Sequence, residues 1–135
     1  KDYFVALWET AVQPDELLVE IRVPTTSMNA NSCYEKFAQP ASRYPYVGCA
    51  VAVDKSGGTC SDVRVGFSGV GHVGFRDFNV EGALKGQALS AASIKAAADT
   101  ATNGVDVLSD WSVSEDYRRA MSRVYARRAL TKVGL

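Results

Sequence analysis

The sequence predicts an α+β fold, in which an antiparallel sheet of three to four strands packs against three helices. Strand-type patterns occupy the first half of the chain, and helix-type patterns occupy the second half. Strands and helices that are separated in this way along the chain are typical of α+β domains. A length of 135 residues is that of one domain, and we expect residues 1–135 to share a single core.

The first expected strand covers residues 17–23, within the stretch ELLVEIRVP. Apolar side chains recur there at every second position, which is the pattern of a half-buried strand, and Pro24 is expected to end it. The apolar positions are Leu17, Val19, Ile21 and Val23. A second, short strand is expected at residues 34–37.

Two further strands are expected at residues 46–53 and 63–67. The first of them is an apolar run of small residues, so we expect both of its faces to be covered. The stretch DKSGG at residues 54–58 lies between them and is a turn signal. The two strands are therefore expected to form an antiparallel hairpin with a longer loop.

The first two helix patterns in the second half are short. A helix is expected at residues 79–85, closed by Gly86. An alanine-rich stretch of high helix propensity predicts a second helix at residues 90–101, with Gly104 as its stop.

The last helix is expected at residues 114–130, with a capping box formed by Ser112 and Glu115. Its apolar side carries Tyr117, Met121, Val124 and Tyr125 at helical spacing. A stripe of arginines follows another side, at Arg119, Arg123 and Arg127. A solvated face explains this stripe, because cations suit a helix C-terminus; a protein–protein contact is the alternative.

The composition excludes several classes of function. Fifteen Lys and Arg residues balance fifteen Asp and Glu residues, so net charge does not indicate a nucleic-acid or membrane partner. No apolar run approaches the roughly 20 residues of a membrane span, and no signal-peptide pattern is present. The chain begins with lysine, which we expect of a processed product, a trimmed chain or one piece of a longer protein.

The three cysteines, at positions 33, 49 and 60, include no CxxC pair. This count argues against a disulfide framework and against a metal site made by this chain alone. Three free thiols suit the reducing cytoplasm, which is the location we expect.

Candidate catalytic residues are few. His72 is the only histidine and has no flanking nucleophile motif, so a structural or exposed role is favoured over catalysis. The same glycine-rich stretch contains the spacing GxGxxG at Gly69, Gly71 and Gly74. A dinucleotide site also needs a βαβ unit, which is not expected here, so a strand exit with unusual backbone angles is the better interpretation.

Lys36 lies in the middle of the expected strand at residues 34–37, between aromatic residues and next to a turn. Lysine is rarely buried, and the residues alone favour a surface role. The alternative is a fixed cation that stabilises negative charge on a ligand. These patterns alone indicate an α+β domain without catalytic residues of its own.

Several stretches, in a fixed order, carry a resemblance to a known family. They are PDELLVEIRVP (14–24), YEKFAQPASRYPYVGCAVAV (34–53), VRVGFSGVG (63–71), the pattern R…ExxLxG from Arg76 to Gly86, and SEDYRRAMSRVYARRAL (114–130). With this ordered set, the chain resembles the C-terminal domain of the FAD-binding (medium) subunit of molybdenum hydroxylases. That group includes the carbon monoxide dehydrogenase and xanthine dehydrogenase families.

The resemblance implies the same α+β sandwich and a part in electron transfer. In that family, electrons pass from a molybdenum cofactor through two 2Fe–2S clusters to FAD, and the metal centres belong to partner subunits. The domain covers part of the flavin and helps to dock the iron–sulfur subunit, while the N-terminal part of its own subunit holds the FAD pyrophosphate. Because no such phosphate loops are visible here, we expect a C-terminal fragment of a longer FAD-binding subunit. We expect it to bind FAD weakly and to be inactive alone.

The resemblance also implies flavin contacts for particular residues. Lys36 matches a strand lysine that lies close to the flavin, where a cation favours the anionic reduced form. Leu18 matches a leucine in apolar contact with the flavin, and Tyr44 and Tyr46 are weaker candidates in the adjacent turn. Relatives often carry an aspartate where Arg43 stands, so Arg43 is not offered as a site residue.

Two other functions stay open. The first is a non-catalytic dimerisation or protein-binding module of the same fold, without a flavin role. The second is a small independent hydrolase that uses His72, which the local sequence supports least.

Overall fold

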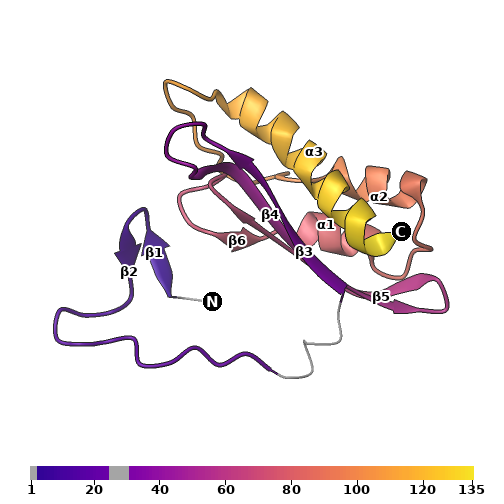
Figure 1. The fold of residues 1–135 in the computed structure, drawn as a ribbon, viewed down its shortest axis with the longest axis horizontal. Coiled ribbons are helices and arrows are strands. Elements are labelled where there is room, and N and C mark those ends of the chain that lie inside the picture. The colour runs from indigo at the N-terminus through magenta and orange to yellow at the C-terminus, as the bar shows by residue number, and fades with distance from the viewer. Residues whose placement is uncertain (1–2, 25–30) are drawn as a thin grey trace.

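The computed structural model describes residues 3–24 and 31–135. A four-stranded sheet with three helices forms the body, and a two-stranded hairpin near the N-terminus lies beside it (Figure 1). The strands are β1 (Phe4–Ala6), β2 (Glu9–Thr10), β3 (Asn31–Ala38), β4 (Pro45–Ser56), β5 (Thr59–Ser68) and β6 (Phe75–Arg76). The helices are α1 (Phe78–Leu84), α2 (Ala91–Ala98) and α3 (Glu115–Gly134). The predicted fold class is confirmed.

The larger sheet is antiparallel throughout, with the strand order β3-β4-β5-β6. The expected hairpin of β4 and β5 is present, but the prediction of a longer loop is wrong. Ser56 pairs with Thr59, so only Gly57 and Gly58 form the loop. Both have positive φ, at 58° and 78°, which a two-residue hairpin turn of the I′ type requires and glycine adopts without strain.

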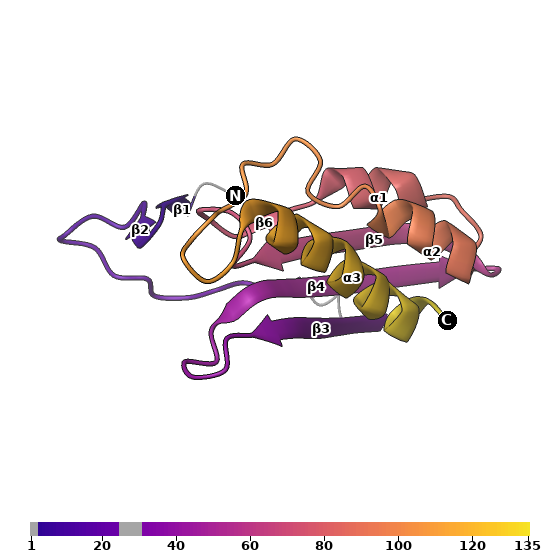
Figure 2. The same cartoon turned by 90° about the horizontal axis from the view of Figure 1, so that it is seen from above.

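All three helices cover one face of the sheet, and the core lies between the two layers (Figure 2). Every second residue of β4 and β5 is buried there, as period-two strands require. The strand contribution includes Val47, Cys49, Val51, Val53, Val63, Val65 and Phe67, and the helix contribution includes Leu84, Ile94, Ala126 and Leu130.

The expectation that residues 46–53 are covered on both faces is wrong. Ala50 is exposed and Ala52 is partly exposed on the face away from the helices. The run of small apolar residues is therefore a strand with one face against the core and the other bare among the described residues. This bare face is where the candidate site lies.

The helices begin at capping side chains. The side chain of Asp77 accepts hydrogen bonds from the amides of Asn79 and Val80, and Ser90 forms a capping box with Ser93. Helix α2 ends at Ala98, three residues earlier than expected.

The predicted capping box of Ser112 and Glu115 is wrong. The hydroxyl and amide of Ser112 both donate to Asp110, which forms a local turn instead of a cap. Helix α3 begins after Ser114, whose hydroxyl accepts from the amide of Tyr117, and it continues to Gly134.

The predicted strand at residues 17–23 is also wrong. The segment is irregular and exposed, with Leu17 and Val19 close to fully exposed at 87% and 88%. An alternating pattern forms a strand only where a neighbouring strand accepts its backbone hydrogen bonds, and no described strand pairs with this segment. Strands β1 and β2 pair only with each other. Residues 3–24 thus carry a dense set of apolar side chains outside the core.

Among the described residues, no helix is long and apolar enough to cross a membrane.

Candidate functional site

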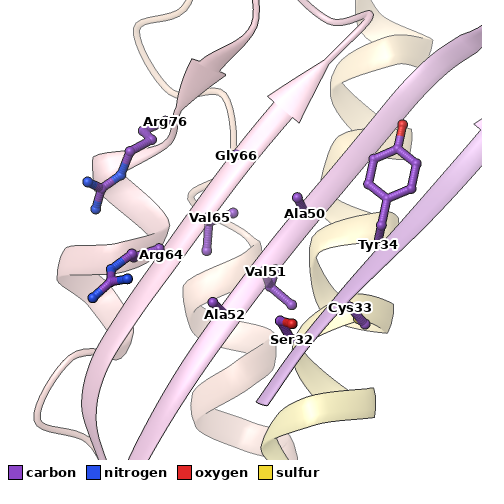
Figure 3. A pocket seen from close by; sticks show the side chains of 10 residues that line it. All are labelled: Ser32, Cys33, Tyr34, Ala50, Val51, Ala52, Arg64, Val65, Gly66 and Arg76. Atoms are coloured by element: carbon purple, nitrogen blue, oxygen red, sulfur yellow. The ribbon is translucent and has the colours of Figure 1, made fainter. Parts of the chain in front are cut away.

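On the bare face of the sheet, small residues form a flat area, called the floor below, between larger side chains. The floor consists of Gly48, Ala50 and Ala52 of β4 and Gly66 and Ser68 of β5. Tyr34 of β3 stands at one side of this floor, and Arg64 and Arg76 stand at the other (Figure 3). Small residues let a flat group approach the sheet closely, whereas the flanking side chains supply polar contacts.

Tyr34 lies across the floor at Gly48. Its hydroxyl is 3.4 Å from the hydroxyl of Ser68 on β5, two strands away. A Cβ atom on Gly48 would overlap the Tyr34 hydroxyl and would lie 2.5 Å from the Ser68 oxygen. Glycine at position 48 therefore lets the Tyr34 ring lie across the sheet, and any larger residue there would displace the Tyr34 and Ser68 hydroxyls.

Lys36 extends from the same face as Tyr34, two residues further along β3 and next to the β3–β4 turn. It is exposed, and its ammonium group donates to the carbonyl oxygen of Arg43 at 3.2 Å. Within the described part of the chain, this is the one hydrogen bond of the three that an ammonium can donate. Lys36 is thus held loosely at the end of the bare face, with donors available for a ligand.

The turn that holds Lys36 has a defined backbone. Gln39 and Tyr44 are joined by a backbone hydrogen bond of 2.8 Å, and the Gln39 side chain accepts from Ser42. Arg43 has a φ of 64°, which is unfavourable for a non-glycine residue and which turns its carbonyl group toward Lys36.

The other predicted site residues differ in their positions relative to Lys36. Tyr44 is 68% exposed in the turn. The Tyr46 ring packs beside Phe37, with ring centroids 5.4 Å apart, and Phe37 in turn packs against α3, so Tyr46 lies on the helix side. Leu18 is 55% exposed and lines a shallow hollow made entirely by residues 3–20.

Arg118 of α3 is a buried arginine that helical spacing in the sequence did not single out. It is 3% exposed and donates to the carbonyl oxygens of Tyr46, Gly69 and Leu108 at 2.6–3.0 Å. It also pairs with Asp110 at 2.7 Å. Hydrogen bonds from the hydroxyl and amide of Ser112 lower the pKa of Asp110 to about 2. One guanidinium therefore joins the start of β4, the exit of β5 and the loop before α3, at the end of the sheet that carries Lys36.

The predicted arginine stripe is divided in the structure. Arg119 is tied down by Glu115 and by the carbonyl oxygens of Thr102 and Val105. Arg123 and Arg127 are exposed, as a solvated face predicts.

Arg76 and Glu81 form a fixed ion pair at the other edge of the bare face. The Glu81 side chain is 10% exposed and accepts two hydrogen bonds from Arg76, at 2.9 and 2.6 Å, and one from the Val65 amide at 2.9 Å. The Arg76 guanidinium also lies over the Phe78 ring, 5.0 Å from its centroid. These contacts hold the half-exposed guanidinium in one orientation.

Two connected hollows cover this part of the bare face. One of about 500 Å³ lies between Tyr34, Arg64 and Arg76 (Figure 3). The other, of about 860 Å³, extends to the N-terminal hairpin and has mainly aromatic walls. The residues common to both are Tyr34, Ala50, Gly66 and Arg76.

The glycine-rich stretch after β5 is explained by packing. Gly69 has a φ of 73°, and a Cβ atom there would overlap the carbonyl oxygen of Pro45. The expectation of a strand exit with unusual backbone angles is confirmed. His72 is exposed and lies 3.9 Å from an exposed carboxylate of Asp106, its one ion-pair partner among the described residues.

The cysteines offer no reactive thiol at this face. Burial raises the pKa of Cys49 to about 12, so its thiol is neutral at physiological pH. Burial also raises the pKa of Cys33, whose sulfur donates to the carbonyl oxygen of Ala129. The described residues contain no cluster of three His, Cys, Asp or Glu side chains that could hold a metal ion.

The comparisons with known proteins agree with this architecture. The family model described as "CO dehydrogenase flavoprotein C-terminal domain" matches residues 32–133. This match places the chain in one class of proteins, the flavoprotein domains of the molybdenum hydroxylase type. The chain belongs to the CO dehydrogenase flavoprotein C-terminal domain family.

Individual relatives align over nearly the whole chain. The carbon monoxide dehydrogenase medium chain of Hydrogenophaga pseudoflava is 31% identical over 95% of this chain and 45% of its own length. The alpha subunit of the 6-hydroxypseudooxynicotine dehydrogenase complex of Paenarthrobacter nicotinovorans is 30% identical over 98% and 45%. The chain therefore spans about half the length of the curated relatives that it matches.

Solved structures give the same result. A carbon monoxide dehydrogenase from Hydrogenophaga pseudoflava, which lacks the Mo-pyranopterin moiety of its molybdenum cofactor, superposes with a TM-score of 0.88 at 32% identity. A Cu,Mo-containing CO dehydrogenase superposes with a TM-score of 0.84 at 29% identity. Each match covers 98% of this chain and 46% of the other chain.

Proposed function

We propose that this chain is the C-terminal part of the FAD-binding subunit of a molybdenum, iron–sulfur and FAD hydroxylase, in which it covers one side of the flavin and is not catalytic alone. The observation that carries the proposal is the position of Lys36 in a member of this family. It extends from the bare sheet face, beside a floor of small residues, with ammonium donors available.

The described residues suit the flavin ring of FAD better than its phosphates. When bound, FAD supplies the two-electron redox chemistry. The cation of Lys36 would stabilise negative charge on the reduced ring, and exposed Leu18 would contact the ring through its apolar surface. Tyr44 lies in the same turn as the Lys36 partner Arg43, whereas Tyr46 packs beside Phe37 on the helix side. The Gly69 region suits tight backbone packing and does not resemble a phosphate cradle.

The proposal assigns the remaining parts of the reaction to partners. The N-terminal part of the same subunit would hold the FAD pyrophosphate, an iron–sulfur subunit would dock nearby and deliver electrons, and a molybdenum-cofactor subunit would oxidise the substrate. The complex named for the relative from Paenarthrobacter nicotinovorans and the medium chains of CO dehydrogenases support such an assembly. Three free cysteines support a reducing cytoplasm as its location.

A second candidate function has its own observation. The exposed apolar side chains of residues 3–24 suit a protein-binding or dimerisation module without a flavin role. Large exposed apolar residues in this segment are Phe4, Val5, Leu7, Trp8, Leu17, Leu18, Val19, Ile21 and Val23. The effect of Leu18 on flavin binding separates the two functions.

Replacing Leu18 with aspartate is expected to raise the FAD dissociation constant of the complete flavoprotein subunit about tenfold or more. The reason is the loss of apolar contact with the ring, which is worth roughly 1.5–3 kcal/mol for a buried leucine. The fluorescence of released FAD measures the effect.

The neighbouring Leu17→Asp variant is the matched control, since Leu17 is 87% exposed and is not assigned a flavin contact. Leu18→Asp should also leave the urea-unfolding midpoint of the 135-residue chain unchanged, because Leu18 lies outside the core. Equal FAD affinity in the Leu18→Asp variant and the unmodified subunit would favour the protein-binding module.

A further inference from the structure

The ion pair of Arg76 and Glu81 has no part in the flavin contacts proposed above. Here Glu81 occupies the Nε and one terminal N–H, so three of the five guanidinium N–H groups have no acceptor among the described residues. The side chain of Arg76 is 52% exposed and lines both hollows.

Contacts with neighbouring side chains hold the Arg76 guanidinium in place, as is typical of side chains that bind a ligand. Glu81 is itself held by the amide of Val65, and the Phe78 ring lies below the guanidinium. A cation held in one orientation loses less conformational entropy when it binds a ligand than a free surface arginine does. Arg64 lines the smaller hollow on the same side of the floor, where its guanidinium pairs with Asp62 at 3.1 Å (Figure 3).

The larger hollow has the size and lining of a small-molecule site. Its volume of about 860 Å³ lies within the range of ligand pockets, which are mostly apolar with a few convergent polar groups. Its floor is formed by Ala50, Gly66 and Ser68, which allow a flat ring to approach the sheet. The aromatic walls are Tyr3, Phe4, Tyr34 and Phe78, whereas the rings of Phe67 and Phe75, whose backbone also lines the hollow, pack against the core.

We propose that this hollow binds a flat aromatic molecule that carries a carboxylate. The ring lies on the small-residue floor between the aromatic walls, and the carboxylate accepts hydrogen bonds from the outer edge of Arg76. Aromatic stacking suits the walls, and a planar guanidinium fork suits a carboxylate better than an ammonium does. The small-residue floor is shared with the flavin site proposed above, but Arg76 takes no part in that site, so a test that reads Arg76 and not Lys36 or Leu18 distinguishes the two proposals.

The test is a titration of the 135-residue chain with 2-naphthoate, followed through backbone amide chemical shifts. We expect saturable shifts at Gly66, Ser68 and Gly74, and about tenfold weaker binding in the Arg76→Lys variant. Arg127→Lys, on the exposed side of α3, is the matched control and should bind as the unmodified chain does. The neutral isostere 2-naphthamide should bind about tenfold more weakly than 2-naphthoate.

A second variant keeps the test decisive if Arg76→Lys fails to fold. Gly66→Val would place its Cβ no closer than 3.6 Å to any neighbouring atom outside the adjacent residues, so the sheet should tolerate it while the floor is blocked. Binding should then fall below detection. Binding that is unsaturable, unchanged in Arg76→Lys or Gly66→Val, or equal for the neutral isostere would overturn the proposal.

Discussion

Replacing Arg118 with alanine is expected to lower the free energy of unfolding of this chain by about 3–5 kcal/mol. The buried guanidinium satisfies the carbonyl oxygens of Tyr46, Gly69 and Leu108 and pairs with Asp110. Alanine would leave those carbonyl groups without this donor and open a cavity between the start of β4, the exit of β5 and the loop before α3. Urea unfolding followed by circular dichroism measures the change.

Arg123 provides the comparison on the same helix. It is exposed, and Arg123→Ala should change the free energy of unfolding by no more than about 0.5 kcal/mol. If Arg118→Ala lowered the free energy of unfolding by less than about 1 kcal/mol, the buried guanidinium would not be what joins the start of β4, the exit of β5 and the loop before α3.

The second large effect is expected at Gly69. Its φ of 73° is costly for any residue with a side chain, by about 1–2 kcal/mol, and a Cβ atom would overlap the backbone carbonyl of Pro45. Because neither strand end can move without breaking the Arg118 contacts, Gly69→Ala should lower the free energy of unfolding by about 3 kcal/mol in total. Thermal and urea unfolding both report this change.

A control of opposite sign lies in α1. Gly82 has a negative φ, and a Cβ atom there would meet no neighbour within 4 Å. Gly82→Ala should therefore stabilise the chain by about 0.5–1 kcal/mol, because alanine loses less backbone entropy in a helix. If Gly69→Ala were as stable as Gly82→Ala, the conclusion that the positive φ and the Pro45 carbonyl require glycine at position 69 would be wrong.

Local patterns were sufficient to predict the body of the fold. Strands β4 and β5 each bury every second side chain, and that periodicity is visible without any knowledge of the partners. The extent of α3 was predicted, but its buried face was not: Tyr117 is exposed and Val124 is partly exposed, whereas the buried residues include Arg118, Ser122, Ala126 and Leu130. The segment at residues 17–23 shows the limit of this reasoning. Its alternation is as regular as that of β5, but a strand also needs a neighbour, and the sequence does not say whether one is present.

The candidate site was predictable only in part. The alternation along β3 places Lys36 on the face opposite the core, as the residues alone favoured. The side of Tyr46 was not predictable, because the strand register shifts between Phe37 and Ala38. The burial of Arg118 depends on carbonyl groups that are 49 and 72 residues away in the sequence, so helical spacing singled out Arg119 instead.

The flavin midpoint potential of a Lys36→Ala variant of the complete flavoprotein subunit tests the central proposal most directly. Loss of a cation near the ring disfavours the anionic reduced flavin, and the two-electron potential should fall by on the order of 30 mV. Lys55→Ala, at the far end of β4, is the control and should leave the potential unchanged. A potential that is the same in the Lys36→Ala variant and the unmodified subunit would contradict the placement of Lys36 beside the flavin.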